Sequence, residues 1–540
     1  MCKIILFSGF FILLLLCLPM GVQATEPILL GDLNPGTFAV GFSVEHHYDH
    51  SRTFGGNKDT QKEISRPIQI LIWFPARPDN DQVHMKYKEY LFLAATELDF
   101  TPPDEKRKYV LIEEYGRFPM GKNKNLADSP LFQNALEKTT LAKKNARPLP
   151  GSYPLIIYGA GGGDQAFDNH ILCEYLASHG YVVASCPSFG YSSREYGPGH
   201  IGIESHIRDS EFVLGKLLER EYVDKNTVGA LGYSWGGFSS IFMAMRNNRV
   251  KALVSLDGSE HMTHRIETMK SFPFYQPRLL RAHSMHISGG GRSHDFGFFK
   301  GLKYTDAYHL HFPNLSHGHF GSRNIYLLIN SLENIPDAMK DYLKNGYCTV
   351  CRYTLKFFDA YLRKDQKGME YLQNNPDENG VRPGMMTLES KKAMEIPPMD
   401  EEFFSIIQNR GVDEAVRLFA EIRKKDPSAV LFDEVKMNIL GYSYLNEGRI
   451  QESEKVLRMN VQTYPESWNV YDSLAEAYMK MGDKEKAILN YEKSLELNPQ
   501  NATAIKNLKE LKKNGSLSST NDINSKVKDK NFLLELETKV

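Results

Sequence analysis

Apolar runs and amphipathic stretches alternate along the middle of the chain. Short runs rich in Val, Ile and Leu and bounded by Gly or Pro are typical of buried strands, whereas apolar residues spaced three or four positions apart are typical of helices. We therefore expect strands at 66–75, 154–158, 181–184, 228–231, 252–256, 285–287 and 308–312, and helices at 169–179, 204–221, 234–246 and 354–362. This alternation predicts an α/β fold, in which helices cover both faces of a mostly parallel sheet.

One long segment interrupts the alternation. Residues 84–150 are charged and aromatic, and they show only short helical pieces such as 87–98. We expect an α/β domain over residues 25–365 that carries 84–150 as an insertion over its core.

The C-terminal third of the chain contains a repeat. Pro465 and Pro499 are 34 positions apart, and the same register pairs Leu440 with Leu474, Gly441 with Ala475, Tyr444 with Tyr478, Gly448 with Gly482, Ser453 with Ala487 and Leu457 with Tyr491. Small and large residues in this register are typical of tetratricopeptide repeats, which are stacked helical hairpins. We expect an all-α domain of such repeats at 399–513, with a degenerate first unit marked by Ala415, Phe419 and Pro427. A linker at 366–398 would precede it, and a polar tail at 514–540 would follow.

The first 24 residues have the form of a secretory signal peptide. Lys3 precedes an apolar run from Ile4 to Leu18, and the small-residue site Val22-Gln23-Ala24 follows. The run is shorter than the ~20 residues of a membrane-spanning helix, and no other stretch is as long and apolar. We expect cleavage after Ala24, export to the periplasm or the exterior, and a mature chain without a transmembrane segment.

The composition says little about partners. The 540 residues carry a formal net charge of -1, which indicates no bias toward nucleic acid or anionic membranes. Export would leave Cys173, Cys186, Cys348 and Cys351 in a compartment that permits disulfides. Four cysteines in so long a chain do not make a disulfide scaffold, and we interpret them as buried structural thiols, with their pairing left open.

A pentapeptide at the end of an expected strand carries the candidate nucleophile. Ser234 lies in Gly232-Tyr233-Ser234-Trp235-Gly236, directly before an expected helix rich in small residues. With 41 glycines in the chain the motif alone could arise by chance. Its position between a strand and a helix is the context of a nucleophile elbow, and it predicts that the Ser234 hydroxyl is exposed at the carboxyl edge of the sheet.

A serine nucleophile needs a base and an orienting acid. Two histidines, His317 and His319, follow the last expected strand, and position alone does not choose between them. Asp257 follows the strand 252–256, and Asp295 follows the next strand, so either carboxylate could orient the base. Backbone N–H groups of Trp235 and of the glycine-rich turn 159–163 could hold an oxyanion.

Other chemistry is less well supported. The turn 159–163 lacks the spacing of a nucleotide-binding loop. His309, His311, His317 and His319 lie close together in sequence, but no carboxylate-rich ligand motif accompanies them. We therefore expect no metal and no cofactor.

Over roughly residues 35–364 these motifs resemble the secreted platelet-activating factor acetylhydrolase and dienelactone hydrolase branch of the α/β-hydrolases. The resemblance lies in the strand and turn at 154–163, the helix and strand around 176–184, the elbow, and the closing helix around 357–362. It implies Asp257 as the acid, with Asp295 as backup, and His317 of a His-x-x-Phe element as the base, with His319 as backup. It further implies Gly162 and Trp235 as the oxyanion donors, although Ala160-Gly161 stands where the family usually has histidine and glycine.

The expected function is that of an exported serine hydrolase, similar to an acetylhydrolase or esterase. It would cleave a small-molecule or lipid-like carboxylic ester through an acyl-enzyme, with the insertion and the loop around Phe189 and Tyr191 shaping the pocket. One alternative is a serine peptidase or amidase of the same fold. Another is an interaction scaffold that binds a protein partner through its repeats and carries an inactive hydrolase domain.

Overall fold

The computed structural model describes residues 29–55, 64–78, 82–117, 125–193, 200–272, 275–291, 294–332 and 334–513. The chain forms two compact units, Met1–Met394 and Glu395–Val540. The expected signal peptide 1–24 and polar tail 514–540 lie outside the described residues.

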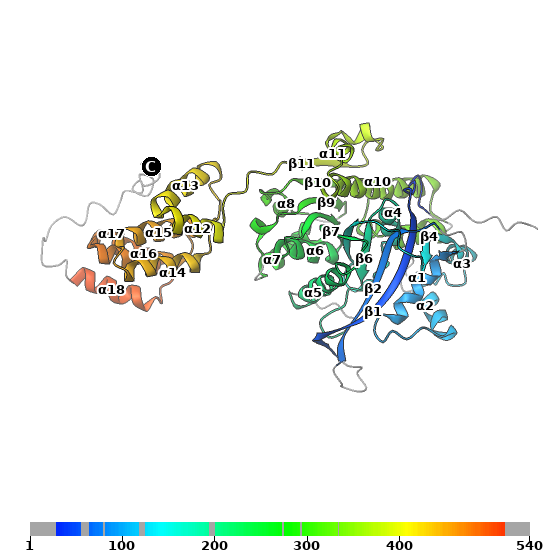
Figure 1. The fold of residues 1–540 in the computed structure, drawn as a ribbon, viewed down its shortest axis with the longest axis horizontal. Coiled ribbons are helices and arrows are strands. Elements are labelled where there is room, and N and C mark those ends of the chain that lie inside the picture. Colours follow the sequence, from blue (N-terminus) through cyan, green and yellow to red (C-terminus); the bar gives the residue numbers. More distant parts are fainter. Residues whose placement is uncertain are drawn as a thin grey trace, which may run out of the picture. The chain divides into compact units, whose positions relative to one another are not determined.

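The first unit is built on one sheet of eleven strands in the order β11-β10-β9-β8-β7-β5-β6-β2-β1-β4-β3 (Figure 1). Its central part, from β10 to β6, is parallel throughout. The strands are β1 Ala39–Phe54, β2 Ile64–Ala76, β3 His84–Lys86, β4 Thr139–Lys144, β5 Tyr153–Gly159, β6 Val182–Cys186, β7 Val223–Tyr233, β8 Val250–Leu256, β9 His283–Gly289, β10 Ala307–Phe312 and β11 Thr387–Lys391. All the strands expected from the sequence are present.

Helices cover both faces of this sheet (Figure 1). Side chains of a strand alternate between the faces, so Ile156 and Tyr158 of β5 join one apolar core, whereas Leu155 and Ile157 join the other. The helices are α1 Tyr87–Leu93, α2 Glu105–Arg117, α3 Pro130–Glu137, α4 His170–Ser178, α5 His200–Leu217, α6 Trp235–Arg246, α7 Thr263–Lys270, α8 Gly297–Gly301, α9 Ser322–Ser331, α10 Asp337–Leu362 and α11 Gln366–Gln373. Residues of α4 and α10 line the first core, and residues of α5 and α6 line the second.

The first unit extends further along the chain than the sequence predicted. Residues 366–398 were expected to be a linker, but they contain helix α11 and strand β11, which pairs antiparallel with β10. The error has a physical cause: β11 is an edge strand with largely exposed side chains, so it lacks the apolar run that marks a buried strand.

Strand β1 was missed for a related reason. Its second half is polar and partly exposed, yet it pairs with β2 along most of its length. The insertion 84–150 supplies β3 and β4, which extend the same edge of the sheet beyond β1. The insertion therefore adds to the sheet as well as covering the core.

The second unit consists of helical hairpins. Its helices are α12 Glu401–Arg410, α13 Val412–Lys425, α14 Glu434–Asn446, α15 Ile450–Thr463, α16 Trp468–Met481, α17 Lys484–Leu497 and α18 Ala502–Lys513. A Cβ atom on Gly441 would lie 2.4 Å from the Leu457 side chain, so α14 and α15 meet where the repeat register has a small residue facing a large one. Gly448 and Gly482 adopt left-handed backbone between the helices of their hairpins, which explains why glycine recurs there.

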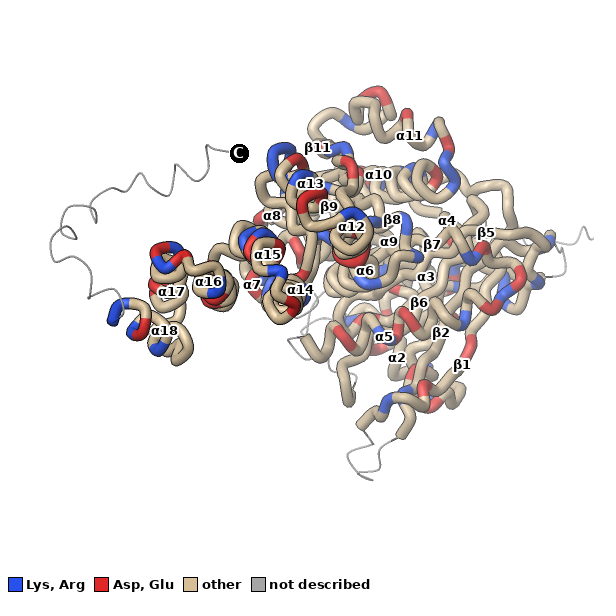
Figure 2. The backbone as a smooth tube through the Cα atoms, turned by 60° about the vertical axis from the view of Figure 1, so that its left-hand side comes forward, with Lys and Arg blue, Asp and Glu red and all other residues tan. Residues whose placement is uncertain are grey.

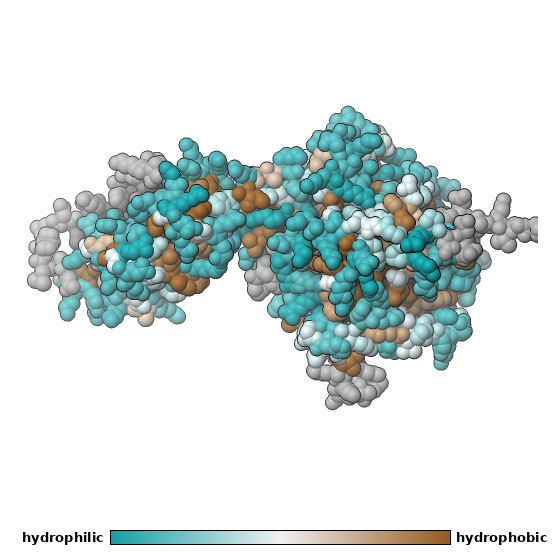
Figure 3. Space-filling view, in the orientation of Figure 1, coloured by the Kyte–Doolittle hydropathy of each residue, from teal (hydrophilic) through white to brown (hydrophobic). Residues whose placement is uncertain are grey.

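The surfaces of both units are mixed in character. Basic and acidic residues are interspersed along the helices of each unit (Figure 2), and apolar residues are scattered among polar ones on the face in Figure 3. In the described part of the chain, every helix is too short or too polar to cross a bilayer.

Candidate active site

Ser234 lies at the sharp turn between β7 and α6. Its backbone has φ 55° and ψ -121°, a conformation that residues with side chains rarely adopt. The Ser234 N–H donates to the carbonyl oxygen of Leu256 on β8, and the N–H groups of Gly237 and Phe238 donate to the Ser234 carbonyl. These bonds hold the strained turn in place, as expected at a functional site.

The glycines of the pentapeptide are required by close backbone contacts. A Cβ atom on Gly232 would lie 2.2 Å from the carbonyl oxygen of Gly236, and one on Gly236 would lie 2.0 Å from the carbonyl oxygen of Gly159. Any side chain at either position would therefore push the elbow away from β5 or distort it. The motif is explained by the geometry of a strand-turn-helix elbow.

His317 lies next to the Ser234 hydroxyl. Its Nε2 atom is 2.9 Å from the Oγ of Ser234, and its ring stacks on that of Tyr233 with centroids 5.0 Å apart. The Tyr233 hydroxyl also donates to the His317 carbonyl oxygen at 3.1 Å. Tyr233, the second residue of the pentapeptide, thus positions the histidine from both its ring and its hydroxyl, a role that sequence reasoning missed.

Asp257 lies on the other side of the His317 ring. Its Oδ2 atom is 2.5 Å from Nδ1 of His317, and its Oδ1 atom accepts a hydrogen bond from the Gly289 N–H at 2.8 Å. Burial by itself would raise the pKa of Asp257, but the hydrogen bonds from His317 and Gly289 hold that pKa below its usual value. The carboxylate is therefore charged at neutral pH and faces the imidazole.

The two backup residues lie elsewhere. His319 accepts a hydrogen bond at its Nδ1 atom from the Ser316 N–H, 3.0 Å away, and so caps the short helix His317–Phe320. Asp295 accepts at Oδ1 from the Gly297 N–H at 2.6 Å, and its side chain is exposed. The structure therefore joins Ser234 to His317 and Asp257, and it engages His319 and Asp295 in local turns.

The turn expected to hold an oxyanion packs against the elbow. The backbone of Gly159 and Ala160 approaches Gly236 so closely that a Cβ atom there would lie 2.5 Å from the Ala160 carbonyl oxygen. Gly162 follows in this turn, and Trp235 directly follows Ser234. Their roles as N–H donors stay predictions.

A buried arginine that sequence reasoning missed connects the segment after this turn to the histidine loop. Arg323 of α9 pairs with Asp168 at 2.8 Å, and it donates to Oε1 of Gln165 at 2.6 Å. Because α9 begins just after the loop of His317, Arg323 links the two loops that flank Ser234. An isolated arginine within a helix carries no sequence signal of such a role.

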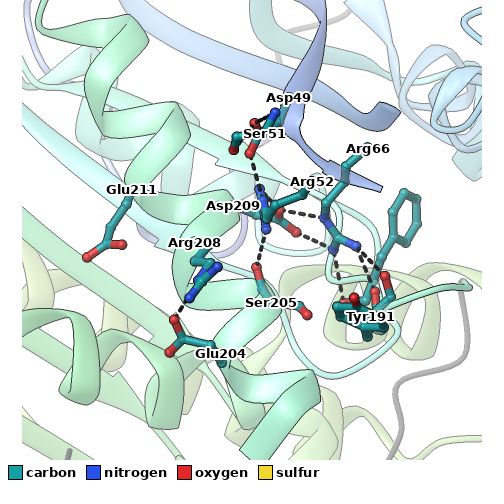
Figure 4. Close-up of polar contacts among 12 residues, drawn as sticks. Asp49, Ser51, Arg52, Arg66, Tyr191, Glu204, Ser205, Arg208, Asp209 and Glu211 are labelled. Atoms are coloured by element: carbon teal, nitrogen blue, oxygen red, sulfur yellow. Dashed lines mark hydrogen bonds and ion pairs between the residues drawn. The ribbon is translucent and has the colours of Figure 1, made fainter. Parts of the chain in front are cut away.

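A second buried ion pair supports the loop after β6. Arg66 of β2 and Asp209 of α5 form two contacts, at 2.5 and 2.7 Å (Figure 4). Arg66 also donates to the carbonyl oxygens of residues 189–191. Within this loop Phe189 is buried against Phe54, whereas Tyr191 is 58% exposed. Of the two residues expected to shape a pocket, Phe189 therefore supports the loop from within, and Tyr191 is available at the surface.

The other candidate histidines, His309 and His311, and the four cysteines make contacts away from Ser234. His309 and His311 both lie 2.9 Å from the Ser288 hydroxyl, whereas His317 contacts Ser234 and Asp257, and His319 contacts Ser316. The thiols of Cys173, Cys186, Cys348 and Cys351 are buried and free, which agrees with structural thiols. Burial raises the pKa of each of these thiols.

Two parts of the chain match known protein families. Residues 214–295, which include the elbow and Asp257, match the family described as BAAT / Acyl-CoA thioester hydrolase C terminal, and residues 473–501 match the tetratricopeptide repeat. A stretch of 106 residues is 28% identical to dipeptidyl-peptidase 5 of Porphyromonas gingivalis and covers 18% of this chain. The match spans only 15% of the length of that relative.

A solved structure that is similar in part is the ferulic acid esterase from Streptomyces cinnamoneus, with a TM-score of 0.41 and 19% sequence identity over 62% of this chain and 93% of that one. Taken with the sheet topology and the elbow, the family matches confirm the expected fold class. The chain combines an α/β-hydrolase fold with C-terminal tetratricopeptide repeats, and the matches support a hydrolase.

Proposed function

We propose that the chain is an exported serine hydrolase that cleaves carboxylic esters, with Ser234 as nucleophile, His317 as base and Asp257 as orienting acid. One observation carries the proposal. The Ser234 hydroxyl, both ring nitrogens of His317 and one Asp257 oxygen form a continuous series of contacts at 2.9 and 2.5 Å. A serine, histidine and carboxylate in this order are the parts needed for nucleophilic acyl transfer.

The chemistry follows from this order. His317 takes the Ser234 proton at Nε2 as the Oγ atom attacks the ester carbonyl, and the N–H groups of Gly162 and Trp235 stabilise the resulting oxyanion. His317 then gives the proton to the departing alcohol as the bond between the acyl carbon and the alcohol oxygen breaks. The acyl group stays on Ser234. Water, activated by the same imidazole, releases the acid and restores the hydroxyl.

Asp257 acts through the histidine. Its contact with Nδ1 leaves the lone pair of Nε2 facing Ser234, and its negative charge stabilises the imidazolium that forms during attack. The Gly289 N–H holds the second carboxylate oxygen, so the Asp257 carboxyl group is fixed in orientation. Asp257 is therefore held in the position that the mechanism requires before substrate binds.

The ester preference is inferred from the resemblance of the motifs to acetylhydrolases. The thioester family matched at 214–295 and the peptidase relative favour related substrates, a thioester and an amide. All three share an acyl carbon that a serine can attack. Hydrolysis rates for an ester, a thioester and an anilide can be measured on one preparation, with the same short acyl group in each substrate. These rates distinguish the three substrate classes. An anilide rate equal to the ester rate would contradict the ester proposal.

Labelling with a fluorophosphonate tests the nucleophile and the base. We expect the mature protein and the His319→Ala variant to label and turn over ester, whereas Ser234→Ala does neither and His317→Ala labels at least tenfold more slowly. His319→Ala is a matched control because it removes a neighbouring imidazole from the same short helix. Labelling of Ser234→Ala would overturn the mechanism, as would full activity of His317→Ala.

Export is the second part of the proposal, and it rests on the form of residues 1–24. Expression of the full chain in a Gram-negative host tests it. We expect the product in the periplasm or medium to begin at Thr25 by N-terminal sequencing. A product that stays in the cytoplasm with Met1 intact would contradict it.

The repeats support a protein partner in addition to the ester substrate. Val435 and Ile439 of α14 are 60% and 63% exposed although apolar, and α14 packs next to α16. Stacked helical hairpins present extended concave surfaces that can bind a partner. Capture of one protein by the mature chain, but not by a Val435→Glu and Ile439→Glu double variant, would support a partner on this face. The scaffold alternative would require that the purified chain shows no Ser234-dependent labelling.

A further inference from the structure

A group of buried histidines lies beside the turn that carries Asp257. Glu260 and His261 belong to the short helix Ser259–His261 that follows this turn, and His286 comes from the adjacent strand β9. Glu260 and His286 are fully buried, and His261 is 1% exposed. The hydrolase mechanism uses none of these three side chains, so their burial needs another explanation.

Their donor atoms converge. One carboxylate oxygen of Glu260 and one ring nitrogen from each of His261 and His286 all lie within 4.8 Å of one another. The Oε1 atom of Glu260 is 3.0 Å from Nδ1 of His286 and 3.4 Å from Nε2 of His261. Ligands bound at about 2.05 Å to a tetrahedral Zn²⁺ lie about 3.3 Å apart, so these separations are close to those of a metal site.

The hydrogen bonds around the group are incomplete. In the described part of the chain, neither ring nitrogen of His261 has a hydrogen-bond partner, and its contact with Glu260 lacks the alignment of a hydrogen bond. Buried imidazole nitrogens almost always have a partner, so an unpartnered pair indicates a missing group. A metal ion would accept the lone pair of the unprotonated ring nitrogen.

The charge of the group also favours a bound cation. Among the described residues, the ion pairs of Glu260 are with His261 and His286, and no Lys or Arg pairs with it. A buried carboxylate without a permanent positive charge is costly to fold. A divalent cation would supply that charge.

We propose that Glu260, His261 and His286 bind a divalent transition metal ion, for which Zn²⁺ is the best match. Two imidazoles and one carboxylate are a common ligand set for this ion, whereas Mg²⁺ and Ca²⁺ prefer oxygen ligands throughout. The Ser284 hydroxyl lies 3.2 Å from Nε2 of His286, so it can accept from that nitrogen while Nδ1 binds the metal. The ring of His309 lies 5.6 Å from that of His261.

The role of this metal is structural. The ion would tie the turn after β8 to β9, and β9 also supplies the Gly289 N–H that holds Asp257. Because the three ligands are buried, the ion would enter during folding and leave slowly. The site does not depend on which acyl substrate the chain cleaves.

Metal analysis of the mature chain, purified without a histidine tag, tests the site directly. We expect about one zinc per chain by mass spectrometry. After unfolding with chelator and refolding, we expect Zn²⁺ to raise the Tm. A chain that refolds without bound metal and shows no Tm shift with Zn²⁺, Co²⁺, Ni²⁺ or Mn²⁺ would overturn the proposal.

Variants locate the ion. Glu260→Gln and His261→Asn should each lower zinc affinity at least about tenfold, while Glu174→Gln, which alters a buried carboxylate bonded to Tyr90 and Leu141, should keep one zinc. Full zinc content in both Glu260→Gln and His261→Asn would mean that the metal binds elsewhere. If either variant fails to fold, the wild-type content and Tm shift still decide the proposal.

Discussion

The Nε2 atom of His317 lies 2.9 Å from the Oγ atom of Ser234, although the two residues are 83 positions apart in the chain. Parallel strands bring them together, because the loops after β7 and β10 emerge at the same edge of the sheet. The proposed mechanism and the choice between neighbouring residues both depend on this contact.

The carboxylate that orients His317 can be distinguished by substitution. Asp257→Asn removes the charge facing Nδ1, and we expect kcat to fall on the order of 10³-fold or more with KM little changed. Asp295→Asn, which alters an exposed side chain in a local turn, should stay within about twofold of wild type. Steady-state kinetics on one ester decide this, and equal losses in both variants would argue against Asp257.

The elbow tolerates no side chain at Gly236. Gly236→Ala would place a Cβ atom 2.0 Å from the carbonyl oxygen of Gly159, so we expect a loss of stability of about 2 kcal/mol or more and a fall in activity. Gly215→Ala in α5 meets no atom within 4 Å and should stabilise the chain by about 0.5–1 kcal/mol. Urea unfolding of both variants measures the contrast, and a stable, fully active Gly236→Ala would show that the elbow relaxes easily.

The buried pair of Arg66 and Asp209 should matter far more than an exposed pair on the same helix. Arg66→Met removes the fully buried partner of the Asp209 carboxylate and leaves Arg52, 2.7 Å away, as its remaining cation, so we expect a loss of about 3 kcal/mol. Arg208→Gln breaks the exposed pair with Glu204, also drawn in Figure 4, and should cost less than about 1 kcal/mol. Chemical denaturation gives both values, and similar losses in the two variants would show that the buried pair contributes no more than the exposed one.

Glu174 should make stability depend on pH near neutrality. Burial raises the pKa of Glu174 to about 7, against the partial compensation of hydrogen bonds from Tyr90 and Leu141. The folded state therefore holds this proton more tightly than the unfolded state. The resulting stability is fully present below pH of about 4.5 and is lost as the pH rises through about 7, which amounts to about 3 kcal/mol.

A comparison of unfolding curves isolates this carboxyl group. Glu174→Gln replaces the titrating carboxyl group with an uncharged amide of similar size. We expect the free energy of unfolding of the wild type to fall relative to the variant between pH 5 and pH 8. A difference that is constant over this range would show that Glu174 titrates normally.

The regular elements of the chain could be predicted because their signals are local. The strand ending at Tyr233, the helix from Trp235 and the glycines around Ser234 all follow from residues within one turn or strand of each other. The repeat could be predicted for the same reason, since Gly441 and Leu457 face each other within a single hairpin. Strands β1 and β11 could not be predicted, because strands with many exposed side chains lack a continuous apolar run.

Local sequence patterns are enough to place Ser234 at a strand-turn-helix elbow and to show that histidines and carboxylates follow later strands. The contact of His317 with Ser234, while His319 two positions away caps a turn, became known from the folded chain. The same holds for the approach of Glu260 and His261, which follow β8, to His286 on the adjacent strand β9. The reason is physical: local patterns set backbone conformation, whereas the direction and distance of side chains on separate loops are set by the packing of the whole sheet.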